Sequence, residues 1–184
     1  AGWTAYGDAP RAATGAYANI VRPWAAPRGD VDADGLSELI WQDEQAGGLS
    51  ITKATTGRSI ASVRHAAGER FVGTGDFDGD GAQDLLWHDP ESGRTSYTPS
   101  RALPSAPDTR IDVFNDPAWR PTALGDLDGD GTSDLIWTND ASGETHVWLI
   151  VAGARGATGG TRTTILTHPT WRVVAAGDLD GDFK

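Results

Sequence analysis

Three nine-residue segments of the chain place acidic residues at positions 1, 3, 5 and 9 and a glycine at position 6. Calcium prefers about six to eight oxygen ligands, and carboxylates are its usual protein ligands. Alternate residues of a tight loop can direct their oxygens to one point, and glycine tolerates the sharp turn between them. The spacing therefore predicts calcium loops. The predicted carboxylate ligands are Asp30, Asp32, Asp34 and Glu38; Asp76, Asp78, Asp80 and Asp84; and Asp126, Asp128, Asp130 and Asp134.

Position 7 of these loops has no dependable side-chain ligand, because it is Leu36, Ala82 or Thr132. We expect its backbone carbonyl to complete each site, as in other calcium loops. A fourth loop begins with Asp178, Asp180 and Asp182, which we also predict as ligands. It departs from the other loops in having Phe183 where they have glycine.

Two interpretations compete with calcium binding, and a third, the EF-hand, is a different type of calcium loop. An EF-hand would place a bidentate Glu at position 12, where this chain has Trp41, Trp87 and Trp137 inside apolar runs. The acidic segments could also be solvated turns without metal, or catalytic carboxylate pairs. The threefold recurrence of the spacing favours a structural metal loop over both alternatives.

Composition limits the class of protein. The chain has 184 residues, 38% of them hydrophobic, with 24 Gly and 10 Pro, which suits one turn-rich β domain. It has no Cys, so disulfides and thiol chemistry are excluded. The net charge is -11, but the loops hold most of the acidic residues. The sequence contains no basic stripe with interleaved aromatic residues, so nucleic-acid binding is not predicted. No apolar run is long enough to span a membrane.

The loops recur 46, 50 and 52 residues apart, which suits a four-stranded propeller blade. Each unit reads as a strand before the loop, a near-continuous apolar strand after it, a turn, a third strand, a variable loop and a fourth strand. The predicted strands before the loops are 71–75, 119–125 and 171–177, and those after the loops are 38–41, 84–87 and 134–137. The third strands are predicted at 49–52, 95–98 and 145–150, and the fourth at 110–114 and 163–166.

The expected fold is therefore all-β, a partial β-propeller of four-stranded blades in a single domain, residues 1–184. Residues 1–29 read as the end of one blade, 30–75, 76–125 and 126–177 as full repeats, and 178–184 as the start of the next. About three and a half blades cannot close a ring, which needs four or more. We expect the rest of a longer protein, or a second copy, to close it.

The run from Gly125 to Trp137, Gly-Asp-Leu-Asp-Gly-Asp-Gly-x-x-Asp-Leu-Ile-Trp, resembles the FG-GAP/VCBS repeat family. The resemblance extends over nearly the whole chain, because loop, following strand and spacing all recur. It implies a propeller of seven blades when complete, with calcium between the first two strands of a blade. It also implies the ligand sets given above, although the first loop, with Ala33 and Glu38, matches less well.

Aromatic and histidine residues could also serve in packing, in stacking on a ligand or as metal ligands. Trp41, Trp87 and Trp137 are expected to pack between blades. Trp3, Tyr97 and Trp148, on predicted third strands near the rim, are weak candidates for stacking on a sugar. The four histidines show no zinc-ligand spacing.

No nucleophile, base and orienting group stand out, so we expect no enzyme activity from this stretch. The expected function is a secreted or cell-surface, calcium-stabilised binding module. Its expected partner is carbohydrate (a lectin-like module) or a surface protein (adhesion). The alternative is a non-catalytic accessory domain of a secreted hydrolase. Fold alone does not decide between these functions.

Overall fold

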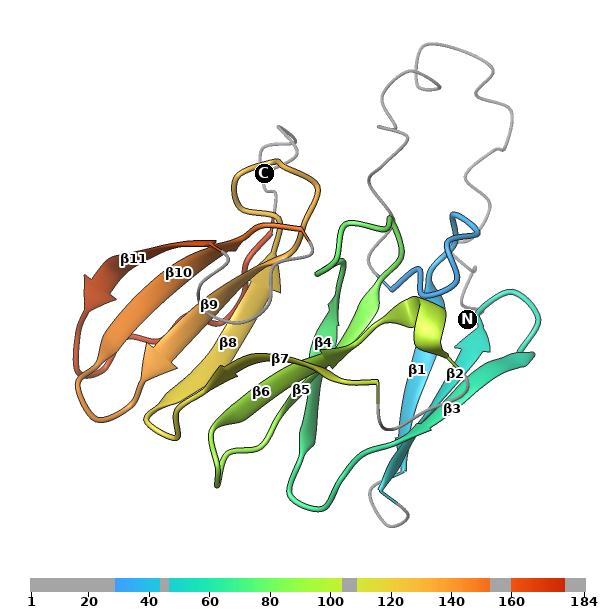
Figure 1. Ribbon diagram of the computed structural model, residues 1–184, viewed down its shortest axis with the longest axis horizontal. Helices are drawn as coiled ribbons and strands as arrows, with labels where there is room; N and C mark the ends of the chain where they lie inside the picture. Colours follow the sequence, from blue (N-terminus) through green and yellow to red (C-terminus); the bar gives the residue numbers. More distant parts are fainter. Residues whose placement is uncertain (1–28, 44–46, 104–108, 153–159, 178–184) are drawn as a thin grey trace, which may run out of the picture.

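The computed structural model describes residues 29–43, 47–103, 109–152 and 160–177. They form three antiparallel sheets that stand in a row (Figure 1). The first sheet contains β1 (Glu38–Asp43), β2 (Gly48–Lys53) and β3 (Ser59–Arg64). The second contains β4 (Arg70–Gly75), β5 (Asp84–His88), β6 (Arg94–Thr98) and β7 (Ile111–Asn115). The third contains β8 (Trp119–Gly125), β9 (Asp134–Asn139), β10 (Glu144–Ile150) and β11 (Gly160–Thr167).

Within each sheet, strands that are consecutive in the chain are hydrogen-bonded neighbours. This up-and-down order is that of a propeller blade, so the predicted all-β fold of blade-like sheets is confirmed. The described residues contain no helix long and apolar enough to cross a bilayer. One short 3₁₀ helix, η2 (Ser100–Ala102), follows β6 and was not expected from the sequence.

The acidic segments 76–83 and 126–133 connect the first two strands of their sheets, β4 to β5 and β8 to β9. The connections were predicted at this place. The loop-to-loop repeats 30–75 and 76–125 therefore each contain the later strands of one sheet and the first strand of the next. The sequence repeat and the sheet are offset by one strand. Residues 1–28 and 178–184, with the predicted partial blades, lie outside the described residues.

Strands that follow the acidic loops are buried in the second and third sheets but not in the first. All five residues of β5 are buried, as are the first five of β9, because their near-continuous apolar sequences have no solvent-facing side. In β1 only Glu38 is buried. The interpretation of these runs as doubly covered strands is confirmed for β5 and β9 and wrong for β1, where Leu39 is 45% exposed.

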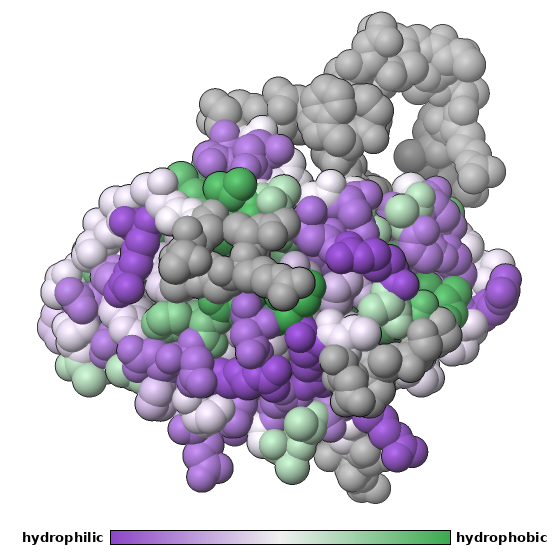
Figure 2. Space-filling model, viewed as in Figure 1, coloured by the Kyte–Doolittle hydropathy of each residue, from purple (hydrophilic) through white to green (hydrophobic). Residues whose placement is uncertain are grey.

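Two hydrophobic clusters lie between the sheets. One joins Leu49, Ile51 and Val63 of the first sheet to Leu85 and Trp87 of the second. The other joins the second sheet to the third through residues that include Leu86, Tyr97, Val113, Leu135, Trp137 and Trp148. Each central tryptophan thus packs against the preceding sheet. Figure 2 shows that hydrophilic residues predominate on the visible face, with hydrophobic residues in small separate patches.

Two expectations require correction. Trp41 was expected to pack like Trp87 and Trp137, which are fully buried, but it is 57% exposed, because no described sheet precedes its own. Residues 171–177 were predicted as a strand and form none. In the complete sheets this strand pairs with the one that follows the acidic loop. No described residue follows the loop at Asp178, so residues 171–177 have no such partner strand in the described part of the chain.

Candidate metal centres

Three groups of carboxylates converge as the sequence predicted. Within each group, one oxygen from every residue lies within 4.8 Å of the others. The groups are Asp30, Asp32, Asp34 and Glu38; Asp76, Asp78 and Asp84; and Asp126, Asp128 and Asp134. The donor atoms are all oxygen, which is the set that a hard cation prefers. These clusters could therefore hold metal ions.

The position-5 residues of the second and third loops, Asp80 and Asp130, stand outside the compact groups. One oxygen of Asp80 accepts the backbone N–H of Ala82 at 2.9 Å. One oxygen of Asp130 accepts both the N–H and the hydroxyl of Thr132, at 2.7 and 2.5 Å. These bonds turn the carboxylates toward their own loop backbone. A role for them as ligands stays a prediction.

The first carboxylate of each loop organises the turn. Asp76 accepts the N–H of Gly79 on one oxygen at 2.7 Å and that of Gly81 on the other at 2.9 Å. Asp126 repeats both bonds with the equivalent glycines. Gly81 has φ +87°, a left-handed conformation that strains residues with a side chain. The glycine at position 6 thus lets the loop close around its first carboxylate.

The last carboxylate of the loop begins the following strand and is deeply buried. Asp84 accepts the N–H of Phe77 at 3.0 Å and that of Ser100 at 2.9 Å. Asp134 accepts the N–H groups of Leu127 and Ile150 at 2.7 and 2.8 Å. Burial raises the pKa of Asp84 to about 7 and that of Asp134 to about 6. A bound cation would favour the charged form of both groups.

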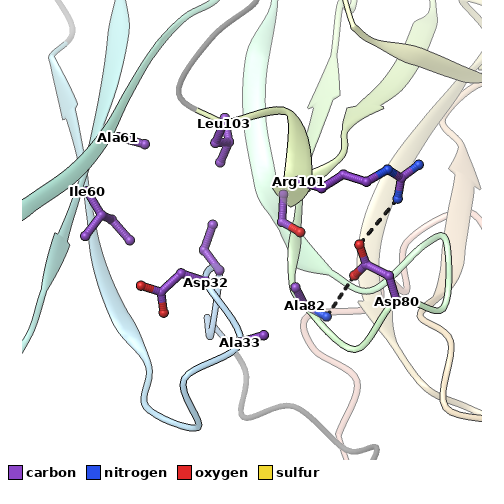
Figure 3. A pocket seen from close by; sticks show the side chains of 10 residues that line it. Asp32, Ala33, Ile60, Ala61, Asp80, Ala82, Arg101 and Leu103 are labelled. Atoms are coloured by element: carbon purple, nitrogen blue, oxygen red, sulfur yellow. Dashed lines mark hydrogen bonds and ion pairs between the residues drawn. The ribbon is translucent and has the colours of Figure 1, made fainter.

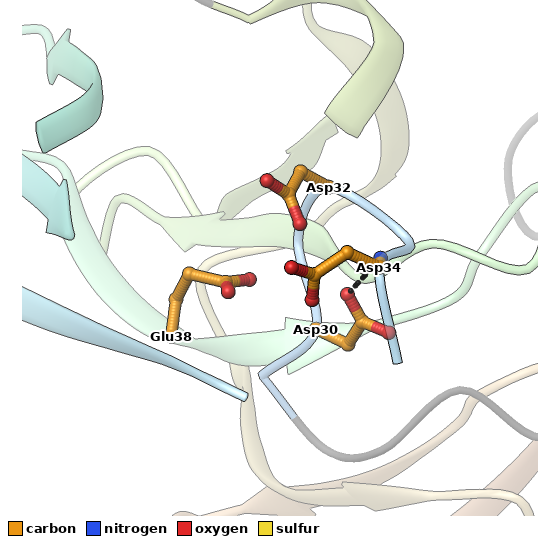
Figure 4. A group of neighbouring side chains, drawn as sticks. All are labelled: Asp30, Asp32, Asp34 and Glu38. Atoms are coloured by element: carbon orange, nitrogen blue, oxygen red, sulfur yellow. Dashed lines mark hydrogen bonds between the residues drawn. The ribbon is translucent and has the colours of Figure 1, made fainter. Parts of the chain in front are cut away.

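The first loop departs from this geometry. Glu38 accepts the N–H of Val31 on one oxygen at 2.8 Å, but its other oxygen lies 3.4 Å from the ammonium of Lys53. The same ammonium contacts Asp32 at 2.6 Å and Asp34 at 2.5 Å. Figure 4 shows the four carboxylates of this loop directed toward a common centre. Ala33 replaces a glycine at φ +57°, a conformation uncommon for residues with a side chain.

The contacts of the Lys53 ammonium shift the pKa of Lys53 and that of Asp34. The hydrogen bond with Asp32, followed by that with Asp34, raises the pKa of Lys53 above its usual range. The bond from Lys53 lowers the pKa of Asp34. In the second loop the guanidinium of Arg101 pairs with Asp78 and Asp80, and the Arg101 side chain is 58% exposed. Among the described residues, no Lys or Arg pairs with the carboxylates of the third loop.

Consecutive loops are hydrogen-bonded to one another. The N–H of Gln83 in the second loop donates to the carbonyl of Asp30 at 2.8 Å. The N–H of Ser133 in the third loop donates to the carbonyl of Asp76 at 2.7 Å. The N–H of Asp76 donates in return to Ser133 Oγ at 3.0 Å. Each bond joins position 8 of one loop to position 1 of the preceding loop, so the acidic loops form one connected row.

A cavity of about 370 Å³ lies between the first and second sheets, beside their acidic loops (Figure 3). Asp32 and Ala33 of the first loop line it, with Asp80 of the second loop and Arg101 of η2. Ile60 and Leu103 supply part of its apolar wall (Figure 3). The full lining is Val31, Asp32, Ala33, Ile60, Ala61, Asp80, Ala82, Ser100, Arg101 and Leu103.

The predicted sugar-stacking residues require a correction. Tyr97 and Trp148 are 3% and 6% exposed and belong to the core between the second and third sheets, so no sugar ring can stack on them. Their side chains are covered because the second and third sheets pack face to face at this cluster. Trp3 lies outside the described residues, as do Asp178, Asp180 and Asp182.

Thr132 and Ala82 were predicted to contribute backbone ligands. The Thr132 hydroxyl, which donates to Asp130, also lies 2.8 Å from the carbonyl oxygen of Ile150, and Ala82 is buried. Backbone ligation at either residue stays a prediction. Lys53, Arg101 and the backbone donors Ser100 and Ile150 were missed. Lys53 could have been found by counting the hairpin register, since it pairs directly with Glu38.

Blade-like antiparallel sheets with an acidic loop between their first two strands define a repeat protein of the β-propeller class. Residues 126–184 match a family model described as FG-GAP-like repeat, and the chain carries such a repeat there. The resemblance expected from the sequence is confirmed for this segment. No curated protein and no solved structure matched the chain.

Proposed function

We propose that the chain is a calcium-stabilised, non-catalytic module that binds carbohydrate in the cavity between its first two sheets. The observation that carries the proposal is the composition of that cavity. Its volume of about 370 Å³ falls within the range of small-molecule sites. A sugar presents hydroxyl groups at its edges and C–H groups on its faces, and the lining offers counterparts to both.

The polar counterparts are Asp32, Asp80, Ser100 and Arg101, and the apolar ones include Ile60 and Leu103. Arg101 is the best placed for recognition, because its exposed guanidinium has donors beyond those paired with Asp78 and Asp80. Two acidic loops form part of the wall, so a cation held among the carboxylates of each loop would keep the cavity in shape. The alternative partner, a cell-surface protein, would contact the rims of the sheets.

The protein is proposed to be secreted or to lie at the cell surface. Extracellular calcium modules bind the ion at Kd values of about 10⁻⁴–10⁻³ M, which suffices in a calcium-rich medium. The proposal of a binding module without catalysis rests on how the described carboxylates are used. Asp76, Asp84, Asp126 and Asp134 accept backbone N–H groups of their loops and strands, which suits structural roles.

A glycan array probed in the presence of calcium tests the proposal. We expect binding to a restricted set of glycans and its loss in the Arg101→Ala variant. Arg120→Ala is the matched control, since Arg120 pairs with Asp140 at 2.6 Å and does not line the cavity. Binding to no glycan, or equal losses in the two variants, would contradict the proposal. Retention of a surface-protein ligand by Arg101→Ala would favour the alternative partner.

A further inference from the structure

We propose that Lys53 is the resident cation of the first acidic loop, so that calcium binds the second and third loops and not the first. This inference rests on calcium binding as part of the proposed function. It concerns which carboxylate clusters bind the ion. The three segments have similar acidic spacing, so the spacing does not distinguish the clusters. The structure distinguishes the clusters by the basic residues that reach them.

The Lys53 ammonium contacts three of the four carboxylates in the first cluster. Its Nζ lies 2.6 Å from Asp32, 2.5 Å from Asp34 and 3.4 Å from Glu38. An ammonium has three N–H donors and no acceptor. The three donors are therefore matched by three carboxylate partners. The Lys53 side chain is only 17% exposed, so most of its length is covered by its surroundings.

The fold directs Lys53 to this place. Lys53 pairs with Glu38 across the antiparallel strands β2 and β1. In all three sheets a leucine follows the last acidic residue of the loop, and its partners are Thr52, Thr98 and Trp148. The residues that follow these partners are Lys53, Pro99 and Leu149. Only the first sheet therefore has a cationic side chain at this position.

The first loop, the one that Lys53 contacts, also differs from the others in its acid at position 9. Asp84 uses its second oxygen to accept the N–H of Ser100, and Asp134 uses its own to accept that of Ile150. Glu38, which is longer by one methylene, presents its second oxygen to the Lys53 ammonium instead. A backbone donor is thus replaced by a full positive charge. Calcium entering this loop would have to displace that charge or bind beside it, against Coulomb repulsion.

Arg101 provides the internal comparison. It approaches the second loop from solvent, with a side chain 58% exposed, and pairs with Asp78 and Asp80 but not with the buried Asp84. The guanidinium can turn away without disturbing a strand. In the third loop no described basic residue is present. Calcium affinity is therefore expected to decrease from the third loop to the second, with the first excluded.

The test is calcium titration by isothermal calorimetry of calcium-stripped protein, with Lys53→Met as the central variant. Methionine keeps much of the length of the side chain and removes the charge. We expect Lys53→Met to bind one more calcium ion per chain than the wild type. The additional ion should be lost again in the Lys53→Met, Asp32→Asn double variant. In the wild-type background Asp32→Asn should leave the number of bound ions unchanged.

Arg101→Met is the matched control, for which we expect tighter binding at the second loop without an additional ion. An unchanged stoichiometry in Lys53→Met, or the loss of one ion in wild-type Asp32→Asn, would overturn the inference. If Lys53→Met folds poorly, the Asp32→Asn result decides alone. Failure of the proposed calcium binding is distinguishable, because wild type and Asp126→Asn would then both bind no ion. The role of Lys53 in keeping calcium out of the first loop would then be decided by Lys53→Met alone, which would support it by gaining a site and refute it by gaining none.

Discussion

The indole rings of Trp137 and Trp148 lie 5.1 Å apart in the core between the second and third sheets, and neither buried indole N–H has a hydrogen-bond partner. The other two sheets have a threonine eleven residues after the central tryptophan. Trp87 donates to Thr98 at 2.9 Å, and Trp41 donates to Thr52 at 2.9 Å. In the third sheet the position of that threonine is taken by Trp148, which adds buried aromatic surface at the expense of the hydrogen bond.

This relationship predicts unequal effects of removing the threonine hydroxyl. Thr98→Val leaves the buried Trp87 N–H without an acceptor, so the free energy of unfolding should fall by about 1–3 kcal/mol. The matched control is Thr52→Val, because the Trp41–Thr52 bond is exposed and water can replace it. That change should cost less than about 0.5 kcal/mol. Urea unfolding followed by tryptophan fluorescence measures both, and equal losses would contradict the prediction.

Calcium removal should lower the thermal stability. A ligand that binds only the folded state stabilises it by about 2.7 kcal/mol at one hundred times its Kd. The unfolding midpoint should therefore rise with calcium concentration and fall in excess chelator. Asp126→Asn should reduce the calcium-dependent rise, since Asp126 belongs to the third cluster. Asp140→Asn, at an exposed acid outside the loops, should preserve it. An unfolding midpoint that does not change with calcium concentration would contradict calcium binding by the native loops.

The calcium-free protein should lose stability as the pH rises from about 4 to about 7. Burial raises the pKa of Asp84 to about 7 and that of Asp134 to about 6, above the unfolded value of 3.8. The folded state therefore holds these protons more tightly. Their contribution is full below the unfolded pKa and is lost as the pH rises through the folded pKa. Calcium should oppose this loss by favouring the charged carboxylates.

Denaturant midpoints of calcium-stripped protein, measured across this pH range, check the prediction. Asp84→Asn removes one titrating group, so its midpoint should vary less with pH than that of the wild type. The comparison with the variant isolates Asp84 from His88 and His146, whose pKa values are lowered by burial and which contribute in the opposite direction. Parallel pH profiles of the variant and wild type would show that Asp84 does not titrate as described.

The bonds between neighbouring loops should contribute to stability. Ser133→Ala removes the acceptor of the buried Asp76 N–H, which should cost about 1–3 kcal/mol in the free energy of unfolding. Ser142→Ala is the control, because its hydroxyl contacts Glu144 in an exposed turn. That substitution should change stability by less than about 0.5 kcal/mol. Chemical denaturation measures both free energies of unfolding. If Ser133→Ala loses no more stability than Ser142→Ala, the bonds between the loops do not stabilise the fold.

Local patterns predicted much of this molecule. The acidic spacing, the glycine at position 6 and the apolar run after each loop are all features of short segments. They were sufficient for the carboxylate clusters, apart from Asp80 and Asp130, and for every strand except β3, for which no residues were predicted. Loop closure depends mainly on groups within the loop, such as the bonds from Gly79 and Gly81 to Asp76. Such contacts can be read from spacing alone.

The tertiary structure decided which side chains are covered and which charges meet. Trp41 and Trp87 have equivalent positions in their sheets, yet one is 57% exposed and the other fully buried, because only Trp87 has a described sheet before it. Tyr97 and Trp148 are buried because the second and third sheets pack against each other, and residues 171–177 lack a described partner strand. The contact of Lys53 with Asp32 and Asp34 depends on a strand pairing that brings distant residues together. Burial and ion pairing depend on neighbours distant in the chain, which the spacing of residues within one repeat does not specify.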